Sequence, residues 1–486
     1  MKATPCYVDS KFAPYAFESL QVIDEKAADA LGISLHTLLI NESLKAGKKN
    51  DLRAMRLSEK ATVSDSIIDG IVALSHKTVS SWHEIEHQLN TMVNDVLPTV
   101  IFVAQKVYFN QIKMSMALRD CGYKTIAIVF DENMVAHQKK YFDNLIYTDF
   151  SSFLLFINKT ERPLLLHTQG WLFRYHIPVL INVYKSAHCR QIVEIMDSQS
   201  FYLPCSVLTQ AAEAMQRAWG DDVFENHKLQ SVCEAYIVEH ADGVVFNGND
   251  GYRNSLLSDC VGTQKKNHLS FPSWPLKDFF YSSNVTNFKT KLVFIGGIPP
   301  LTLNRPHEFF GDAQLLTVID KLMSKGCHLD IYNNPLIAQQ KDYPLFYDKF
   351  FELSDSYENF NFYLGEHPQL LGKKIANYDY GLMVYDFSGV YTGDLHFKHL
   401  IPTKLFSYLE AGLPVLVSAR FEAVCEIVLK YNIGLVINEN EIDCIPEIIS
   451  RVSVQDLKRN VLKAREQIQM HNNIHDLIGL YERVIG

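Results

Sequence analysis

The sequence has no hydrophobic run long enough to cross a membrane. Its apolar stretches are interrupted by charges or end within about ten residues, whereas a spanning helix needs roughly 20. The opening residues MKATPCYVDS lack the continuous apolar core of a secretory signal, and the nine cysteines are scattered without a C-x-x-C pair. These absences predict a cytoplasmic protein with reduced thiols, and they leave contact with the inner face of a membrane open.

Motifs for several kinds of site are missing as well. No Gly-x-Gly-x-x-Gly follows the first predicted strand, and there is no P-loop, no H-E-x-x-H, no G-x-S-x-G and no spaced set of Cys and His. A dinucleotide on the first domain is therefore disfavoured, and no metal is expected. The net charge of −9 implies no general affinity for nucleic acid, so a phosphate ligand would need a local basic site.

The sequence does contain two successive series of apolar strands that alternate with helices. The strands Thr99–Ala104 and Lys124–Phe130 enclose a helix, and this βαβ unit predicts a parallel sheet. Further strands are expected at 163–167, 191–196 and 243–247. The alternation restarts at Lys291 with the strands KLVFIGG, HLDIYNN, NFNFYLG, YGLMVYD, VLV and GLVI. The predicted fold class is α/β, with two Rossmann-like doubly wound domains and a cleft between them.

The predicted domain boundaries follow changes in this pattern. Residues 1–95 have helical spacing and form an N-terminal extension, either a separate module or, as we favour, a cover for the next domain's sheet. The first Rossmann-like domain is assigned to 96–275, and its end is interpreted as linker because 268–275 carries two prolines. The second domain is assigned to 285–468, and 469–486 is expected to be a helix that packs back on the first.

The strand-to-helix loops of the second domain are the first candidates for a site. Ligands of open parallel sheets bind beyond the carboxyl ends of the strands. Gly296 and Gly297 follow a strand and would let the backbone approach a phosphate, with Arg305 near in sequence; a tight turn is the alternative. The loop 384–394 is rich in glycine and hydroxyl groups and would suit the polar groups of a ligand.

A third loop lies in Leu395–Ser418, which reads LHFKHLIPTKLFSYLEAGLPVLVS. A short amphipathic helix is expected from Lys404 to Glu410, followed by a buried strand. A helix N-terminus favours anions, whereas Lys404 in the first turn opposes the macrodipole, so an anionic ligand would complete the site. His399 belongs to the same basic segment, for which a solvated surface is the alternative.

Two side chains of the first domain are candidates on its side of the cleft. His167 ends a predicted strand in LLLHTQGW, and Asp197 ends another in VEIMDS. Both would face the second domain if the carboxyl edges of the two sheets meet. A histidine in this position is also commonly structural, so that interpretation stays open for His167.

The motif PTKLFSYLEAGLPVLVS resembles the donor-binding helix of glycosyltransferase family 4 (glycosyl transferases group 1), whose members have the GT-B fold. Other segments over about residues 96–486 are similar to pieces of that family in the same order: HTQGW, Glu234 with AYIVEHADGVVFNGND, FYLGEHPQLLGKKIANYDYGLMVYD and EAVCEIVLKYNIGLVI. The resemblance implies a retaining transfer from a UDP- or GDP-linked sugar donor to a glycan, lipid-linked or protein acceptor. It implies no cofactor and no metal, because the helix dipole, backbone N–H groups and basic side chains offset the charge of the diphosphate.

The resemblance also assigns roles to individual residues. The second domain would bind the nucleotide sugar and the first the acceptor. His167 and Asp197 would act in catalysis, near the sugar and the acceptor. The residues implied on the donor side are Gly296, Gly297, Arg305, His399, Thr403, Lys404, Ser407 and Glu410.

The sequence departs from the family pattern at two positions. Relatives often carry two glutamates where this chain has His399 and Ser407, and Glu410, one turn later, is the nearest carboxylate. These departures keep two alternatives open. In the first, the chain is a non-catalytic GT-B partner or glycan-recognition subunit of another transferase. In the second, it is a sugar-nucleotide epimerase.

Overall fold

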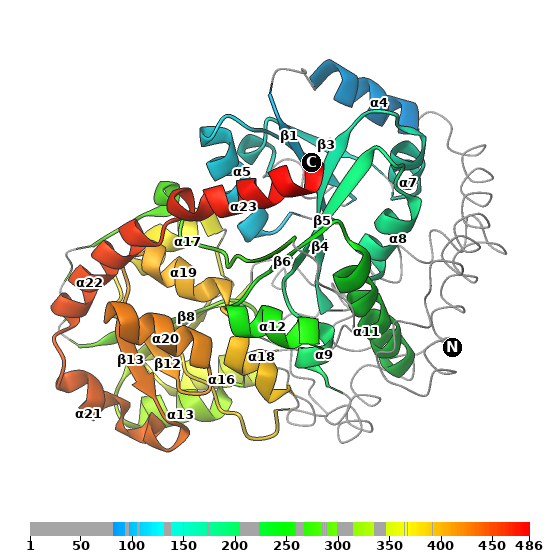
Figure 1. Cartoon of the computed structure of the whole chain (residues 1–486). Coiled ribbons are helices and arrows are strands. Elements are labelled where there is room, and N and C mark those ends of the chain that lie inside the picture. The colour runs from blue at the N-terminus through cyan, green and yellow to red at the C-terminus, as the bar shows by residue number, and fades with distance from the viewer. Residues whose placement is uncertain are drawn as a thin grey trace.

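Two β-sheets organise the chain, each in its own domain (Figure 1). The computed structural model describes residues 81–92, 97–104, 107–130, 138–148, 150–172, 175–204, 223–258, 267–283, 285, 287, 289–298, 314–334, 347–363, 365–366, 368–390 and 392–486. Within these residues, every pairing between the named strands is parallel. Residues 1–80 of the extension and Arg305 lie outside the described residues.

The first domain has a sheet of seven described strands in the order β3-β2-β1-β4-β5-β6-β7. The apolar runs recognised in the sequence form its centre, and each central strand is buried along most of its length. The strands are β1 (Thr99–Ala104), β2 (Lys124–Val129), β3 (Asn144–Tyr147), β4 (Leu164–Gly170), β5 (Cys189–Ile195), β6 (Gly243–Phe246) and β7 (His268–Ser270).

The second domain repeats this arrangement with six described strands in the order β10-β9-β8-β11-β12-β13. The strands are β8 (Lys291–Ile295), β9 (His328–Tyr332), β10 (Phe360–Tyr363), β11 (Tyr380–Met383), β12 (Val415–Ser418) and β13 (Gly434–Ile437). In each sheet the first strand lies between the second and the fourth, which is the doubly wound order of Rossmann-like domains. The predicted α/β class with the two-domain GT-B architecture is therefore confirmed.

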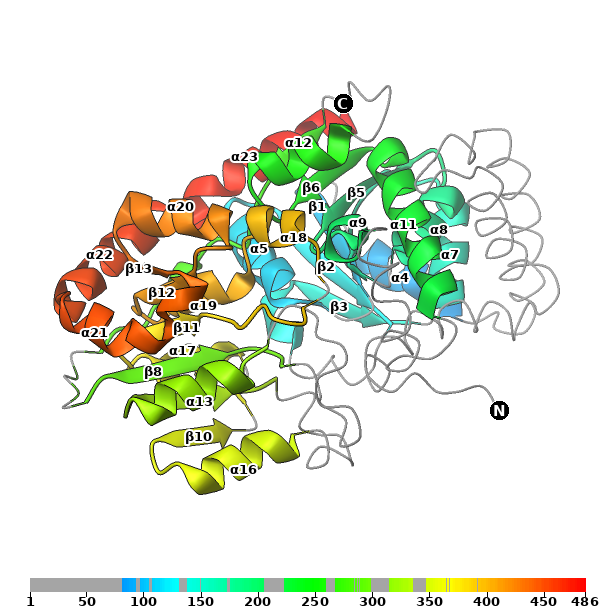
Figure 2. The ribbon, with the colours of Figure 1, turned by 90° about the horizontal axis from the view of Figure 1, so that it is seen from below.

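Helices cover both faces of each sheet (Figures 1 and 2). Those of the first domain are α4 (Ser81–Met92), α5 (Phe109–Asp120), α7 (Phe150–Lys159), α8 (His176–Tyr184), α9 (Gln199–Tyr202), α11 (Val223–His240) and α12 (Asp250–Ser258), with short 3-10 turns η3 (Lys139–Tyr141) and η5 (Lys277–Phe279). Those that follow are α13 (Leu316–Ser324), α16 (Asp348–Ser356), α17 (Pro368–Ile375), α18 (Asp394–His399), α19 (Thr403–Glu410), α20 (Glu422–Tyr431), η6 (Glu439–Cys444), α21 (Ile445–Ser450), α22 (Val454–Gln467) and α23 (Met470–Ile485).

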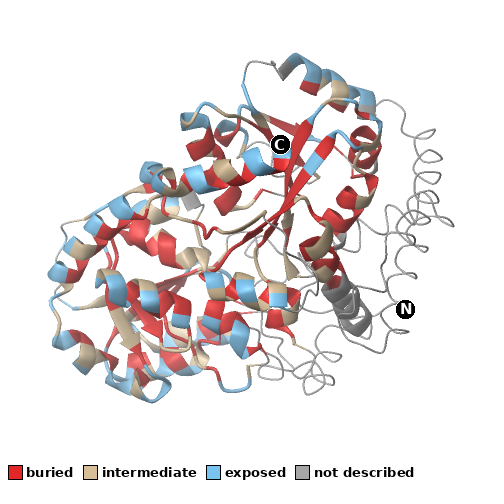
Figure 3. Ribbon diagram, viewed as in Figure 1, coloured by how far each residue is buried: buried red, intermediate tan, exposed pale blue. Residues whose placement is uncertain are grey.

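The buried side chains form one core in the second domain and two in the first, one on each face of its sheet. Helices α4, α7, α8 and α11 cover one face of the first sheet, while α5 and the final helix α23 cover the other. Helix α23 is drawn in red in Figure 1, where it crosses from the second domain to the first sheet. Burial concentrates on the strands and on the inner sides of these helices (Figure 3).

Several elements had no individual prediction from the sequence, among them β7, β3 and α18. The edge strand β7 occupies the start of the segment interpreted as linker. It was missed because its three residues are only half-buried and form no apolar run. Strand β3 and helix α18 were not expected either. Strand β4 continues to Gly170, so His167 lies inside the strand and not at its end, which corrects the predicted boundary.

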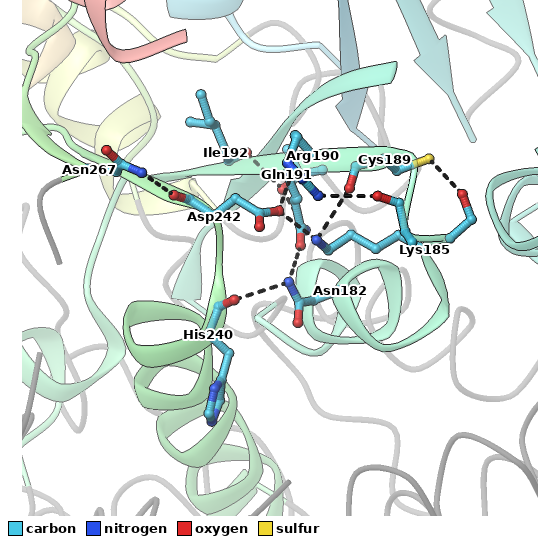
Figure 4. Close-up of polar contacts among 12 residues, drawn as sticks. Asn182, Lys185, Cys189, Arg190, Gln191, Ile192, His240, Asp242 and Asn267 are labelled. Carbon is cyan, nitrogen blue, oxygen red and sulfur yellow. Dashed lines mark hydrogen bonds and ion pairs between the residues drawn. The ribbon is translucent and has the colours of Figure 1, made fainter. Parts of the chain in front are cut away.

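Polar side chains hold the amino ends of β5 and β6 together (Figure 4). The carboxylate of Asp242 accepts hydrogen bonds from Nζ of Lys185 at 2.5 Å and from the backbone N–H of Gln191 at 2.8 Å. The fully buried Gln191 side chain accepts a further bond from Asn182 at 2.9 Å. Because ligands of parallel sheets bind beyond the carboxyl ends, this network at the opposite edge is structural.

The hydroxyl of Tyr408, on α19, fills the place where β8 and β11 diverge. These strands pair at only two positions. Beyond them the hydroxyl accepts from the N–H of Ile295 at 3.1 Å and lies 3.2 Å and 3.0 Å from the carbonyl oxygens of Val293 and Leu382. The ring lies over Gly381, where a Cβ would come within 2.4 Å of it. Tyr408 thereby fixes α19 to the centre of the second sheet.

We expect Tyr408→Phe to lower the free energy of unfolding by about 1–3 kcal/mol, because it leaves buried backbone groups without their partner. Tyr380→Phe is the matched control, since the Tyr380 hydroxyl is buried and has no hydrogen-bond partner among the described residues. Urea titrations of both variants measure the difference. Equal losses would contradict the role given to the Tyr408 hydroxyl.

Candidate functional site

The candidate site of the second domain forms where the chain leaves β8 and enters α19. Gly296, directly after β8, has a φ of 112°, a conformation that favours glycine. A Cβ at Gly296 would lie 3.6 Å from Cε and 3.7 Å from Nζ of Lys404. The structure therefore brings the paired-glycine turn, including the exposed Gly297, next to the first turn of α19.

Aromatic rings hold the ammonium group of Lys404 at this edge of the sheet. Its Nζ lies 4.2 Å from the ring centroid of Phe294 and 5.1 Å from that of Tyr385, and it donates a hydrogen bond to the Tyr385 hydroxyl at 2.5 Å. Cation–π contacts of this kind contribute about 0.5–2 kcal/mol each. They offset the unfavourable position of a cation in the first turn of a helix, and an anion bound there would be attracted by both Lys404 and the helix.

Thr403 and Ser407 complete the exposed side of α19 near Lys404. Thr403 is the first residue of the helix and is half-buried. The Ser407 hydroxyl, one turn later, donates to the Thr403 carbonyl at 3.4 Å. Hydroxyl groups and a cation thus share one end of α19, while its apolar side chains face the core.

The loop that follows β11 is shaped by its own polar groups. The Asp386 carboxylate accepts hydrogen bonds from the N–H and the hydroxyl of Ser388 at 2.9 Å and 2.6 Å. Partial burial acts to raise the pKa of Asp386, but these bonds outweigh it and the pKa is lowered. The Thr392 hydroxyl is buried and has no hydrogen-bond partner among the described residues.

A second cation, Arg420, lies along the same edge and was missed in the sequence. Its guanidinium lies 4.8 Å from the ring centroid of Phe387 and 5.4 Å from that of Phe397, and Nη2 contacts the Asp394 carboxylate at 2.6 Å. Phe387 in turn packs against Tyr385, with ring centroids 6.2 Å apart, so aromatic rings connect Arg420 with Lys404. Arg420 follows the end of β12 by two residues, and the strand-end rule applied to that loop would have found it.

His399 lies at the contact between the domains, away from the Lys404 ammonium's own contacts. Its Nδ1 is 3.1 Å from Oδ1 of Asn249, and its carbonyl accepts from the Asn249 N–H at 3.3 Å. Burial and the neighbouring Lys398 lower the pKa of His399. Together with an antiparallel bridge between Gly248 and Leu400, these bonds tie α18 to the carboxyl edge of the first sheet.

Glu410 joins the two domains at the other end of α19. Its Oε1 contacts Nζ of Lys113 on α5 at 2.7 Å and accepts from the N–H of Leu276 at 2.7 Å. Both charged side chains are almost completely buried. Burial raises the pKa of Glu410 and lowers that of Lys113, while the attraction between them acts in the opposite sense on each. The carboxylate is engaged in an interdomain ion pair that the sequence gave no signal for.

His167 lies in the core between the first sheet and α23. Its ring stacks on Phe102 with centroids 5.1 Å apart, and Nδ1 is 2.7 Å from the Tyr481 hydroxyl. Burial lowers the pKa of His167 to about 3, so the ring is neutral. These contacts give His167 a structural role in packing α23, and its predicted catalytic role is not supported by its position.

Asp197 lies just beyond β5, at the carboxyl edge of the first sheet. Its carboxylate accepts a hydrogen bond from the indole N–H of Trp171, and its backbone carbonyl accepts from the Tyr175 hydroxyl at 2.7 Å. Trp171 directly follows β4, so Asp197 is held between two neighbouring strand ends. Asp197 is half-buried there, and its predicted catalytic role stays a prediction.

Neither a cluster of metal ligands nor a membrane-spanning helix occurs in the described part of the chain. No group of three or more His, Cys, Asp or Glu among those residues could hold a metal ion. None of the described helices is long and apolar enough to span a bilayer.

Comparison with known families supports the predicted glycosyltransferase. A family model described as "Glucosyltransferase 3-like, C-terminal domain" matches residues 338–478, which include α18, α19 and Arg420. A comparison with curated proteins found no match. Membership in glycosyltransferase family 4 is not tested by these findings and stays a prediction.

Among solved structures, the chain is similar to CalG4, the calicheamicin glycosyltransferase, with 9% identity, a TM-score of 0.42 and coverage of 80% of this chain and 99% of that one. AviGT4, a glycosyltransferase involved in avilamycin A biosynthesis, has 10% identity and a TM-score of 0.45, with coverage of 80% and 98%. The UDP-GlcNAc 2-epimerase from Neisseria meningitidis has 12% identity and a TM-score of 0.38, with coverage of 80% and 100%.

We expect Lys113→Met to lower the free energy of unfolding by about 3–5 kcal/mol, because it leaves the Glu410 carboxylate buried without its cation. The double variant Lys113→Met with Glu410→Met removes both charges and should recover most of that loss. Urea titrations of the single and double variants measure the coupling. If the double variant loses as much free energy of unfolding as Lys113→Met and Glu410→Met lose together, the two residues do not act as a pair.

The buried His167 should make the protein sensitive to acid. Its pKa is about 3 in the fold against 6.5 in the unfolded chain, so between these pH values the unfolded state binds a proton that the folded state lacks. Stability from this group is therefore present above pH 6.5 and falls with pH by up to about 1.4 kcal/mol per unit. His167→Gln keeps a polar group for Tyr481 and removes the titration.

The measurement is the difference in free energy of unfolding between His167→Gln and the natural protein at pH 7, 6 and 5. The difference should move in favour of the variant as the pH falls. Glu194, whose pKa burial raises to about 7, titrates with the opposite sign but is present in both proteins and cancels. A difference that stays constant with pH would rule out a neutral buried His167.

Proposed function

We propose that this chain is a glycosyltransferase that uses a UDP- or GDP-linked sugar, with the diphosphate bound where Gly296 meets the first turn of α19. The observation that carries the proposal is the position of the Lys404 ammonium, 3.7 Å from the Cβ that Gly296 lacks. A side chain at Gly296 would occupy the space beside that cation. Its absence leaves room for phosphate oxygens between the turn and Lys404.

This arrangement suits the departure of a nucleoside diphosphate. When the bond between the anomeric carbon and the diphosphate oxygen breaks, negative charge grows on the leaving group, and fixed positive groups stabilise that charge. Lys404 and the N-terminus of α19 would supply the positive charge without a metal ion, and no other cofactor would take part. The acceptor, a glycan, a lipid-linked sugar or a protein, would approach from the first domain, with retention of anomeric configuration.

The remaining donor contacts are assigned to hydroxyl groups. Relatives often place carboxylates where this chain has His399 and Ser407, and His399 is engaged with Asn249 of the first domain. Ser407 and Thr403, half-buried on α19, are the groups closest in sequence to Lys404 that could bind the ribose. Glu410 is the single carboxylate of α19 and is paired with Lys113.

That pairing also favours the second candidate function, a non-catalytic GT-B partner of another transferase. With Glu410 engaged between the domains, α19 offers no carboxylate to the nucleotide sugar. Such a chain would bind no UDP- or GDP-sugar and would co-purify with an active transferase. A sugar-nucleotide epimerase would instead convert the donor when no acceptor is present, which analysis of the products shows.

We expect Lys404→Ala to weaken donor binding at least tenfold, or about 1.4 kcal/mol, because it removes a charge-assisted contact to the diphosphate. The measurement is calorimetric titration with a panel of UDP- and GDP-sugars. Lys398→Ala is the matched control, since Lys398 lies on α18, is exposed and pairs with Glu422 at 3.2 Å.

The outcomes separate the candidate functions. Unchanged affinity in Lys404→Ala would remove Lys404 from the donor site. Failure of the natural protein to bind any member of the panel would overturn the proposed transferase in favour of the non-catalytic partner.

A further inference from the structure

The Tyr385 side chain contacts the Lys404 ammonium in two ways. Its hydroxyl accepts a hydrogen bond from Nζ at 2.5 Å, and the centroid of its ring lies 5.1 Å from the same nitrogen. Tyr385 follows the end of β11 by two residues, whereas Lys404 is the second residue of α19. The contact therefore joins the loop after one central strand to the helix that precedes another.

Tyr385 is itself held firmly by the second sheet, and its side chain is almost completely buried. Its backbone N–H donates to Oγ of Ser418, the last residue of β12, at 3.1 Å. Its ring packs edge to face on Phe294 of β8, with centroids 6.0 Å apart, and against Phe421, with centroids 5.5 Å apart. These contacts fix the position of the Tyr385 hydroxyl relative to the central strands.

The Lys404 side chain depends on such support. A lysine has four rotatable bonds and a strongly hydrated ammonium group, so a half-buried lysine commonly extends toward water. The first turn of a helix also disfavours a cation. In this chain Nζ lies instead 4.2 Å from the ring centroid of Phe294 and 3.7 Å from the Cβ that Gly296 lacks. The rings and the Tyr385 hydroxyl together hold the ammonium beside the glycine turn.

The ring of Phe294 and the hydroxyl of Tyr385 constrain Lys404 differently. A cation is attracted to the whole face of a ring, whereas a hydrogen bond weakens steeply away from its preferred distance and angle. The hydroxyl is therefore the group that sets the direction of the ammonium. A lysine ordered in advance loses less conformational entropy when a ligand binds. A phenylalanine at position 385 would keep the ring and remove only the directional contact.

We propose that Tyr385 is a positioning residue, whose hydroxyl holds the Lys404 ammonium beside the Gly296 turn in the place where it meets an anion. The proposal rests on the proposed function to the extent that this anion is the diphosphate of a nucleotide sugar. Tyr385 acts through Lys404, so its effect on binding should disappear when Lys404 is removed. A tyrosine that only supported the fold would affect binding equally with and without Lys404.

The first test is calorimetric titration of the full chain with UDP and GDP. Tyr385→Phe should weaken binding of the nucleotide that the natural protein binds by about three- to tenfold, because the ammonium must then be ordered by the ligand. Tyr385→Phe combined with Lys404→Ala should bind no more weakly than Lys404→Ala alone. Tyr380→Phe is the matched control and should keep the natural affinity, since it removes a buried hydroxyl of β11 that has no hydrogen-bond partner among the described residues.

The second test needs no nucleotide. The full chain is treated briefly with acetic anhydride, and mass spectrometry of its peptides gives the rate at which each lysine is acetylated. Tyr385→Phe should raise the rate at Lys404 about threefold or more, because a side chain released from its acceptor spends more time extended into solvent. Lys398 is exposed and pairs with Glu422, so its rate should be the same in both proteins.

The outcomes separate this role from the proposed function. A higher rate at Lys404 in a protein that binds neither UDP nor GDP would overturn the proposed function and support the positioning role. Equal affinity of Tyr385→Phe and the natural protein for UDP or GDP would overturn the positioning role and leave the proposed function standing. An unchanged acetylation rate at Lys404, or a loss of affinity that persists in the Lys404→Ala background, would also overturn it.

Discussion

The buried ion pair between Lys113 and Glu410 constrains the relation of the two domains, together with the contact of His399 with Asn249 and the packing of α23 on the first sheet. Lys113 extends from α5, the helix that begins at the switch point of the first sheet, and Glu410 ends α19, the helix that begins at the switch point of the second. Nζ of Lys113 and Oε1 of Glu410 lie 2.7 Å apart. Two buried charges stabilise each other only if their positions are held closely, since burying either one alone is strongly unfavourable. The pair therefore fixes α19, and with it the candidate site at Lys404, relative to α5 of the first domain.

Helix α19 carries out three separate tasks with residues on different sides. Lys404 faces the Gly296 turn, Tyr408 reaches between the diverging strands, and Glu410 contacts the other domain. Eight residues thus connect the Lys404 cation, the core of the second sheet and the first domain. A helix of eight residues is only marginally stable by itself. The many buried contacts of α19 therefore hold it in place.

The sequence predicted those parts of the fold that depend on local patterns. Apolar runs such as Thr99–Ala104 and Val415–Ser418 are strands in the structure, because such runs can be buried on both faces of a parallel sheet. The meeting of Gly296 with Lys404 followed from the rule that strand ends share one edge. The partners of Glu410 and His167 did not follow, since Lys113 and Tyr481 are distant in sequence and no local pattern specifies which buried charge or ring another will meet. Arg420 was within reach of the strand-end rule and was missed.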